Sequence, residues 1–158
     1  MAIKVAGHWE LSWNAPIKEA ELWNLPLRDW SITDWWMWPV SGIKHNEHQR
    51  VTLHERDDLR TILDENQQSI HVYVEPYTRA FKQHEPQDLR DFSHPEDVLY
   101  IFGSAHFNPV MLGFMREHDL SVQIPTMNNK GVLWPHQCLV TLLYDRLVKD
   151  GCNSNRSS

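Results

Sequence analysis

The stretch from residue 98 to residue 149 places the strongest constraint on how this chain can fold. Residues 98–102 form an unbroken apolar run, rich in β-branched and aromatic side chains, which is typical of a strand buried on both faces of a parallel sheet. Gly103 and Ser104 end that strand. Residues 120–125 predict a second strand, because Pro125 cannot donate a ladder hydrogen bond and the chain must leave the sheet there. A loop over residues 126–131 follows.

A closing helix is predicted from Pro135 to Lys149. Pro135 suits the first position of a helix, and Gly151 is typical of a helix stop. The apolar side chains between them recur at helical spacing, at Cys138, Leu139, Leu142, Leu143, Leu147 and Val148.

The rest of the chain alternates predicted strands with predicted helices. Strands are expected near Ile3, Trp36 and Val72, and a short one over 50–54. Helices are expected from a cap at Asn14 to a point before Pro26 and over 57–66, whereas the polar segment 78–96 predicts a surface connection or a short helix. This alternation predicts a single α/β domain over residues 1–152, with a mostly parallel sheet flanked by helices and a disordered tail at 153–158.

Composition and charge limit the classes of function. The 158 residues are 41% hydrophobic and 23% charged, as in an ordinary soluble domain, and no apolar run approaches the ~20 residues that span a membrane. The two cysteines, Cys138 and Cys152, make no disulfide framework, which favours a reducing, cytoplasmic compartment. The net charge of −6 argues against a high-affinity RNA enzyme working alone, although a local patch or a dimer groove can still be basic.

Three segments resemble the last third of the SPOUT RNA methyltransferases, especially the SpoU-like 2'-O-ribose branch. In that family a hydrophobic strand ends in a glycine turn, as at residues 99–104. Another strand ends in Ile-Pro, as at residues 122–125, and the closing helix carries a Tyr-acid pair, as at Tyr144-Asp145. The resemblance implies a C-terminal deep trefoil knot whose loops hold S-adenosylmethionine (AdoMet), without a metal. It also implies a homodimer through the closing helix and a tRNA or rRNA substrate.

The same resemblance implies a set of cofactor-binding residues. They follow the strands that carry the family's pattern, and Gly103 allows a close approach of the backbone. For the residues after the strand near Val72, a simple strand-to-loop turn is the alternative. The set is Glu75, Pro76, Phe102, Gly103, Ser104, Ile124, Gly131 and Leu133.

The catalytic residues depart from the family's pattern. Asn14 matches the family's asparagine, but Glu19 lies in the region where its arginine is expected, and Trp134 stands where another asparagine is expected. A ribose hydroxyl is a poor nucleophile, so methyl transfer needs a positioned acceptor and a group that handles its proton. His136, with an ordinary pKa near ~6.5, is the candidate base, with Glu19 or His8 across the pocket.

Several residues admit two interpretations. His106 and Asn108 either bind substrate or cap the element that follows. The eight tryptophans either stack on bases or form the core and a dimer interface, and the second interpretation is favoured because no Lys or Arg is interleaved with them. His45 and His48 have metal-like spacing but no characteristic third ligand, which favours a solvated loop.

Three functions therefore follow from the sequence. The favoured one is an AdoMet-dependent RNA methyltransferase that works as a homodimer. The second is a catalytically altered SPOUT-fold protein that binds the cofactor or a partner without methylating RNA. The third is an unknotted α/β enzyme or binding protein whose likeness to the family is accidental.

Overall fold

A computed structural model of the chain describes residues 2–9, 16–41, 51–75, 85–104, 106–127 and 133–156. These residues form a seven-stranded sheet in the order β3-β2-β1-β6-β4-β7-β5, in which every neighbouring pair is parallel. The predicted α/β class and parallel sheet are thus confirmed. The strands are β1 (Ala2–His8), β2 (Asp34–Trp38), β3 (Thr52–Glu55), β4 (Ile70–Glu75), β5 (Gln87–Asp88), β6 (Asp97–Phe102) and β7 (Leu120–Gln123).

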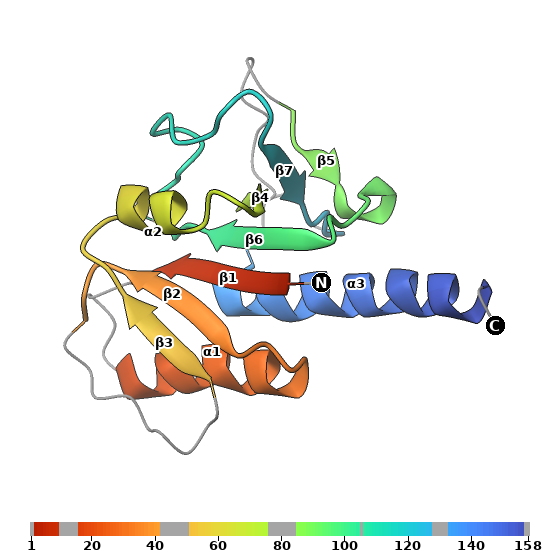
Figure 1. The fold of residues 1–158 in the computed structure, drawn as a ribbon, viewed down its shortest axis with the longest axis horizontal. Helices are drawn as coiled ribbons and strands as arrows, with labels where there is room; N and C mark the ends of the chain where they lie inside the picture. Colours follow the sequence, from red (N-terminus) through yellow and green to blue (C-terminus); the bar gives the residue numbers. More distant parts are fainter. Residues whose placement is uncertain are drawn as a thin grey trace.

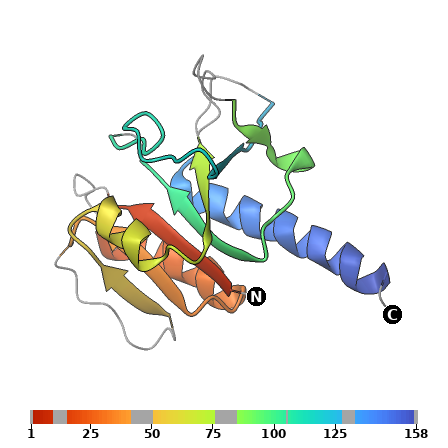
Figure 2. The same cartoon turned by 45° about the horizontal axis from the view of Figure 1, so that its top comes forward.

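Helices cover both faces of the sheet. The helices α1 (Pro16–Asp29) and α3 (Pro135–Arg156) contact each other and cover one face, and α2 (Leu59–Glu65) covers the other (Figure 1). A 3-10 turn, η2 (Leu89–Asp91), joins β5 to β6. Figure 2 shows that the C-terminal half of α3 extends past the ends of the strands.

Tryptophan side chains fill the core beneath α1. The indole of Trp23 stacks on that of Trp35, with ring centroids 5.8 Å apart, and makes a T-shaped contact with Phe102. Gly7 makes room for this packing, because a Cβ there would lie 2.8 Å from the Trp23 ring. Trp36 and Trp38 are also buried, so the core interpretation holds for most of the tryptophans that the structure describes.

The other face is covered by α2 and by a turn that follows β6. Leu59, Ile62 and Leu63 of α2 pack against the sheet, and the Asp58 carboxylate caps the helix by accepting a hydrogen bond from the Thr61 amide at 2.8 Å. Residues 107–115 pack against the same cluster at the carboxyl end of β6.

Two predicted helix ends are wrong, and tertiary packing explains the first of them. The first helix continues through Pro26 to Asp29, since the next residue, Leu27, is fully buried in the core. The closing helix continues through Gly151 to Arg156, and a side chain at Gly151 would meet nothing within 4 Å. The segment 78–96, expected as a surface connection or a short helix, contributes both β5 and η2.

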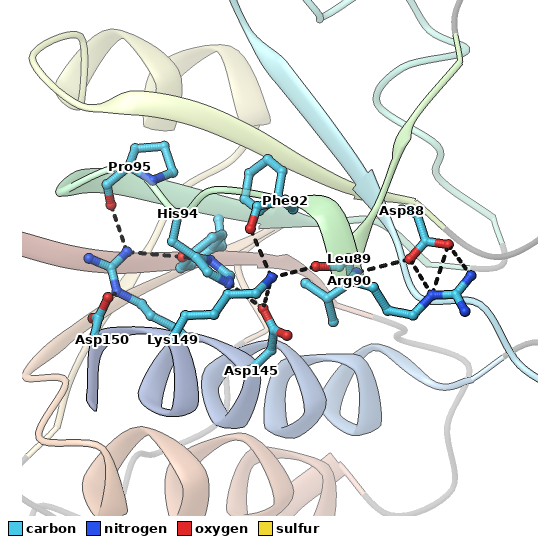
Figure 3. Close-up of polar contacts among 11 residues, drawn as sticks. Asp88, Leu89, Arg90, Phe92, His94, Pro95, Asp145, Lys149 and Asp150 are labelled. Atoms are coloured by element: carbon cyan, nitrogen blue, oxygen red, sulfur yellow. Dashed lines mark hydrogen bonds and ion pairs between the residues drawn. The ribbon is translucent and has the colours of Figure 1, made fainter. Parts of the chain in front are cut away.

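A buried polar cluster ties α3 to the segment before β6 (Figure 3). His94 Nε2 lies 2.7 Å from the Asp145 carboxylate, and its Nδ1 lies 2.7 Å from the Tyr100 hydroxyl. Arg146 donates to the Pro95 carbonyl at 2.7 Å, and Lys149 donates to two more carbonyls of the segment. These contacts hold the closing helix in place over the sheet.

Neither a membrane span nor a metal cluster is found within the described ranges. None of the helices there has the length and apolar character needed to cross a bilayer. Those ranges also bring no three His, Cys, Asp or Glu side chains into a metal-binding arrangement. His45 and His48 lie outside the described residues, and His54 pairs with Asp34 at 2.8 Å.

Candidate functional site

A cavity of about 640 Å³ lies at the carboxyl ends of three adjacent strands. His8 ends β1, Glu75 ends β4, and Gly103 and Ser104 follow β6. The wall is completed by Glu19 of α1, by residues 106–111 and by the start of α3. The carboxyl ends of parallel strands are where open α/β sheets bind ligands, and the volume falls in the range of small-molecule sites.

The cavity brings together six of the residues predicted for the site. These six come from four segments of the chain, one of which contributes three consecutive residues at the end of β6. They are Glu19, Glu75, Phe102, Gly103, Ser104 and Leu133.

The other five predicted residues are not among the lining that is described. His136 and Ile124 are described but do not line the cavity. Asn14, Pro76 and Gly131 lie outside the described residues, so their predictions stay untested.

Two buried carboxylates give the cavity an acidic character. Glu19 is 5% exposed and Glu75 is 7% exposed, and both line the wall. Glu19 lies in the first turn of α1, where the helix dipole favours its negative charge. The described lining contains no Lys or Arg, so the cavity suits a cationic or hydroxyl-rich ligand better than a phosphate.

A histidine and a serine pair within the cavity wall. His8 Nδ1 lies 2.6 Å from Ser104 Oγ, and the His8 ring stacks on Phe107 with centroids 4.9 Å apart and planes 21° apart. Trp38 approaches the ring from another side, with centroids 5.4 Å apart. The imidazole is therefore held by a hydrogen bond and by aromatic neighbours.

The turn after β6 explains why residue 103 is a glycine. Ser104 and Phe107 form a small antiparallel bridge, in which the Ser104 amide donates to the Phe107 carbonyl at 2.9 Å. A Cβ on Gly103 would lie 2.3 Å from that carbonyl oxygen and 2.9 Å from Cδ of Pro109. The glycine thus accommodates the chain's own turn, in addition to any role toward a ligand.

Asn108 has a capping role in the structure and also lines the cavity. Its side-chain oxygen accepts hydrogen bonds from the amides of Val110 and Met111, at 3.1 and 3.2 Å, so Asn108 caps the turn as the structural interpretation predicts. His106 is exposed and lines the cavity, where it remains a candidate for substrate contact.

His136 lies in the first turn of α3, beside Trp134. Burial lowers the pKa of its imidazole below the ordinary 6.5, so it is neutral near pH 7. Its Nδ1 is buried and makes no hydrogen bond within the described part of the chain. Cys138, near the start of the same helix, lines the cavity, and burial raises the pKa of its thiol to about 11, which makes it a poor nucleophile.

Apart from Asn108, sequence reasoning missed the part of the wall formed by residues 107–111. The turn signals Asn108-Pro109 and Gly113 mark a change of direction, but a local signal does not show that the chain returns across the strand ends. His8 is a candidate in the sequence only by its position after the first strand. The hydrogen bond to Ser104 joins residues 96 positions apart and has no local sequence signature.

The chain shares its fold with solved structures of TrmH/SpoU-type proteins, although no family model and no curated protein sequence matches it. An A. aeolicus TrmH/SpoU tRNA modifying enzyme superposes with a TM-score of 0.67 at 14% identity, covering 97% of this chain and 78% of that one. A Bacillus anthracis protein assigned as an RNA methyltransferase gives a TM-score of 0.69 at 13% identity and 95% coverage of both chains.

A SpoU methyltransferase from Streptomyces viridochromogenes, solved in complex with AdoMet, gives a TM-score of 0.68 at 10% identity. The match covers 94% of this chain and 58% of that protein. At these identities the likeness establishes the fold. The resemblance to a divergent SpoU-like protein is thus confirmed at the level of the fold.

Proposed function

We propose that this protein binds AdoMet in the cavity and is an AdoMet-dependent RNA methyltransferase, with tRNA or rRNA as the methyl acceptor. The observation that carries the proposal is the cavity at the carboxyl ends of β1, β6 and β4, in a fold shared with an AdoMet-bound SpoU methyltransferase. Bound AdoMet supplies an activated methyl group on a positively charged sulfur.

The lining residues fit such a ligand. Glu75 offers a carboxylate to ribose hydroxyls or an amino group, and Phe102 and Gly103 offer a surface of ring and backbone against which an adenine can pack. Leu133 supplies apolar contact. We also assign Ser104 to the cofactor site and, from the sequence alone, Pro76, Gly131 and Ile124, of which Ile124 lies outside the cavity lining.

The catalytic residues proposed from the sequence are Glu19, His136 and Asn14. Of the two that the structure describes, Glu19 lines the cavity, so it is placed to orient an acceptor group or to stabilise positive charge. His136 belongs to the first turn of α3, next to the lining residue Pro135, but does not line the cavity itself.

The acidic lining favours a second candidate function. A protein that binds AdoMet without methylating RNA needs no cationic side chains to bind RNA phosphates. The described lining has two carboxylates and no Lys or Arg. The net charge of −6 points the same way.

Three further features belong to the proposal: a deep trefoil knot around the closing segment, a cytoplasmic location, and a homodimer formed through α3. The dimer is supported by exposed apolar side chains on α3 and α1, namely Val140, Tyr144, Leu147, Val148, Leu22 and Leu25. An experimental structure that traces residues 124–135 tests the knot, and imaging of the tagged protein tests the compartment.

The first experiment is a calorimetric titration with AdoMet and with S-adenosylhomocysteine (AdoHcy). Micromolar binding is expected, and Leu133→Trp is expected to weaken it at least tenfold by filling the cavity. Ile70→Trp is the matched control, because Ile70 is 47% exposed at the opposite end of β4 and is expected to bind as the wild type does.

The second experiment separates the two candidate functions. Labelled AdoMet is incubated with unmodified tRNA and rRNA transcripts, and methyl incorporation is measured. Incorporation supports the methyltransferase, whereas cofactor binding without incorporation supports the altered protein. If neither AdoMet nor AdoHcy binds, both candidate functions are overturned.

A further inference from the structure

The pair of His8 and Ser104 is held in a fixed geometry before any ligand arrives. His8 Nδ1 lies 2.6 Å from Ser104 Oγ, and Ser104 is anchored in turn by its backbone bridge to Phe107. Phe107 also stacks on the His8 ring, so one turn fixes both members of the pair. Such preorganisation is what a group needs to transfer a proton efficiently.

We propose that His8 is the general base of the reaction and that Ser104 positions its imidazole, an inference that rests on the proposed methyl transfer. The acceptor oxygen forms a bond to the methyl carbon, and the carbon–sulfur bond breaks with its electron pair retained by sulfur. The hydroxyl proton passes to the His8 imidazole and from there to solvent. When Nδ1 carries the hydrogen and donates it to Ser104 Oγ, the accepting lone pair lies on Nε2.

His8 suits this role better than His136. His8 lines the cavity, whereas His136 does not. The proton transfer turns a neutral imidazole into a cation, and the carboxylates of Glu19 and Glu75 in the same lining favour that cation. The remaining titratable side chains of the described lining are Tyr73, His106 and Cys138.

Ser104 acts on the reaction through His8, so it is a positioning residue. Ser104→Ala removes the hydroxyl bonded to Nδ1 and leaves the ring held by its aromatic neighbours Phe107 and Trp38. The rate is expected to fall by roughly tenfold because the imidazole loses its preferred orientation. The pH dependence of the rate is expected to persist in this variant, since the base itself is retained.

A nuclear magnetic resonance titration tests the position of His8 without any RNA. The ring-proton signal of His8 is assigned by its absence from the spectrum of His8→Asn. Its chemical shift is then followed against pH in the AdoMet and AdoHcy complexes. A sulfonium beside the ring disfavours the imidazolium, so the midpoint is expected to be lower with AdoMet by about half a pH unit or more. His118, whose side chain is 75% exposed and outside the lining, serves as the internal control and is expected to titrate equally in both complexes.

Single-turnover transfer to the RNA transcripts then tests the chemistry. His8→Asn is expected to bind AdoMet like the wild type but to transfer methyl at least about a hundredfold more slowly, with the pH dependence lost. His118→Asn is expected to behave as the wild type. Equal midpoints in the two complexes, or normal transfer by His8→Asn, overturn the inference while leaving the methyltransferase intact. Failure of both ligands to bind overturns the proposed function and this inference with it.

Discussion

At the scale of single residues, Gly103 shows how tightly the cavity wall is built. A Cβ there would lie 2.3 Å from the Phe107 carbonyl oxygen, and backbone cannot move aside as a flexible side chain can. We predict that Gly103→Ala lowers the free energy of unfolding by about 1–3 kcal/mol, the usual cost of overpacking. Urea unfolding measures this change.

Gly151→Ala is the matched control, because Gly151 lies within α3 and a Cβ there would meet nothing within 4 Å. This variant is expected to gain up to about 1 kcal/mol from helix propensity. If Gly103→Ala is as stable as the wild type, the turn is looser than its contacts imply. Because the substitution disturbs the turn itself, a loss of cofactor binding in Gly103→Ala does not by itself locate the ligand.

The buried imidazole of His94 is expected to make the stability of the folded protein depend on pH. Burial lowers the pKa of its imidazole below the ordinary 6.5, against the opposing effect of the hydrogen bond to Asp145. The unfolded chain therefore binds the proton more readily than the folded one, and stability is lost as the pH falls below about 6.5 toward the folded pKa. The slope contributed by one such group reaches about 1.4 kcal/mol per pH unit.

The pH prediction is checked by thermal unfolding between pH 8 and pH 5. The wild type is expected to lose stability below pH 6.5, and His94→Gln is expected to lose less over the same range. Burial also lowers the pKa of His71, so part of the slope persists in that variant. A steeper loss in His94→Gln than in the wild type contradicts the prediction.

At the scale of elements, Lys149 fastens α3 to the segment that precedes β6. Its ammonium donates to the carbonyls of Leu89 and Phe92, at 2.6 and 2.8 Å, and pairs with Asp145 at 2.7 Å. Lys149→Met leaves both carbonyls without this donor, and we predict a loss of about 1–2 kcal/mol in chemical unfolding. Lys18→Met, at an exposed site on α1, is the control and is expected to change stability by less than about 0.5 kcal/mol.

The elements that the sequence predicts well are those whose signals are local. The apolar run 98–102 identifies β6, and the proline at 125 explains why β7 ends at Gln123. Where packing competes with a local signal, packing prevails, as it does for α1 beyond Pro26. The two-residue strand β5 has no pattern of its own, because its pairing with β7 is decided by tertiary contact.

The candidate site likewise contains residues whose place the sequence predicts and residues whose place it does not predict. Gly103, Ser104 and Glu75 follow recognisable strands, so their place at the strand ends is predictable from the sequence. Glu19 and His136 depart from the family's pattern and are predicted only by their positions, and the cavity includes the first and leaves out the second. Which side of a helix start faces a cavity depends on how the helix docks, and sequence spacing alone does not determine that.

At the scale of the whole molecule, the outer face of α3 predicts the oligomeric state. Tyr144 is 60% exposed and Leu147 is 54% exposed, one turn from each other on a helix whose opposite face is buried. We predict that the wild type sediments as a dimer and that Tyr144→Asp with Leu147→Asp shifts it to a monomer. Leu112→Asp, at an exposed apolar site away from α3, is expected to leave the dimer intact, and a monomeric wild type contradicts the prediction.

The net charge of the chain predicts how its affinity for RNA depends on salt concentration. With 15 Lys and Arg against 21 Asp and Glu, we expect few phosphates to be neutralised, and each neutralised phosphate of a single strand contributes about −0.7 to the slope of log affinity against log salt. We predict a slope shallower than about −2 between about 50 and 200 mM salt, measured by fluorescence anisotropy with labelled transcripts. A salt slope steeper than about −2 contradicts this prediction. If the steep slope is lost in the monomeric variant Tyr144→Asp with Leu147→Asp, RNA binds to a basic groove that only the dimer forms. A shallow slope together with methyl transfer means instead that the acceptor is recognised mainly by its base or ribose within the acidic cavity.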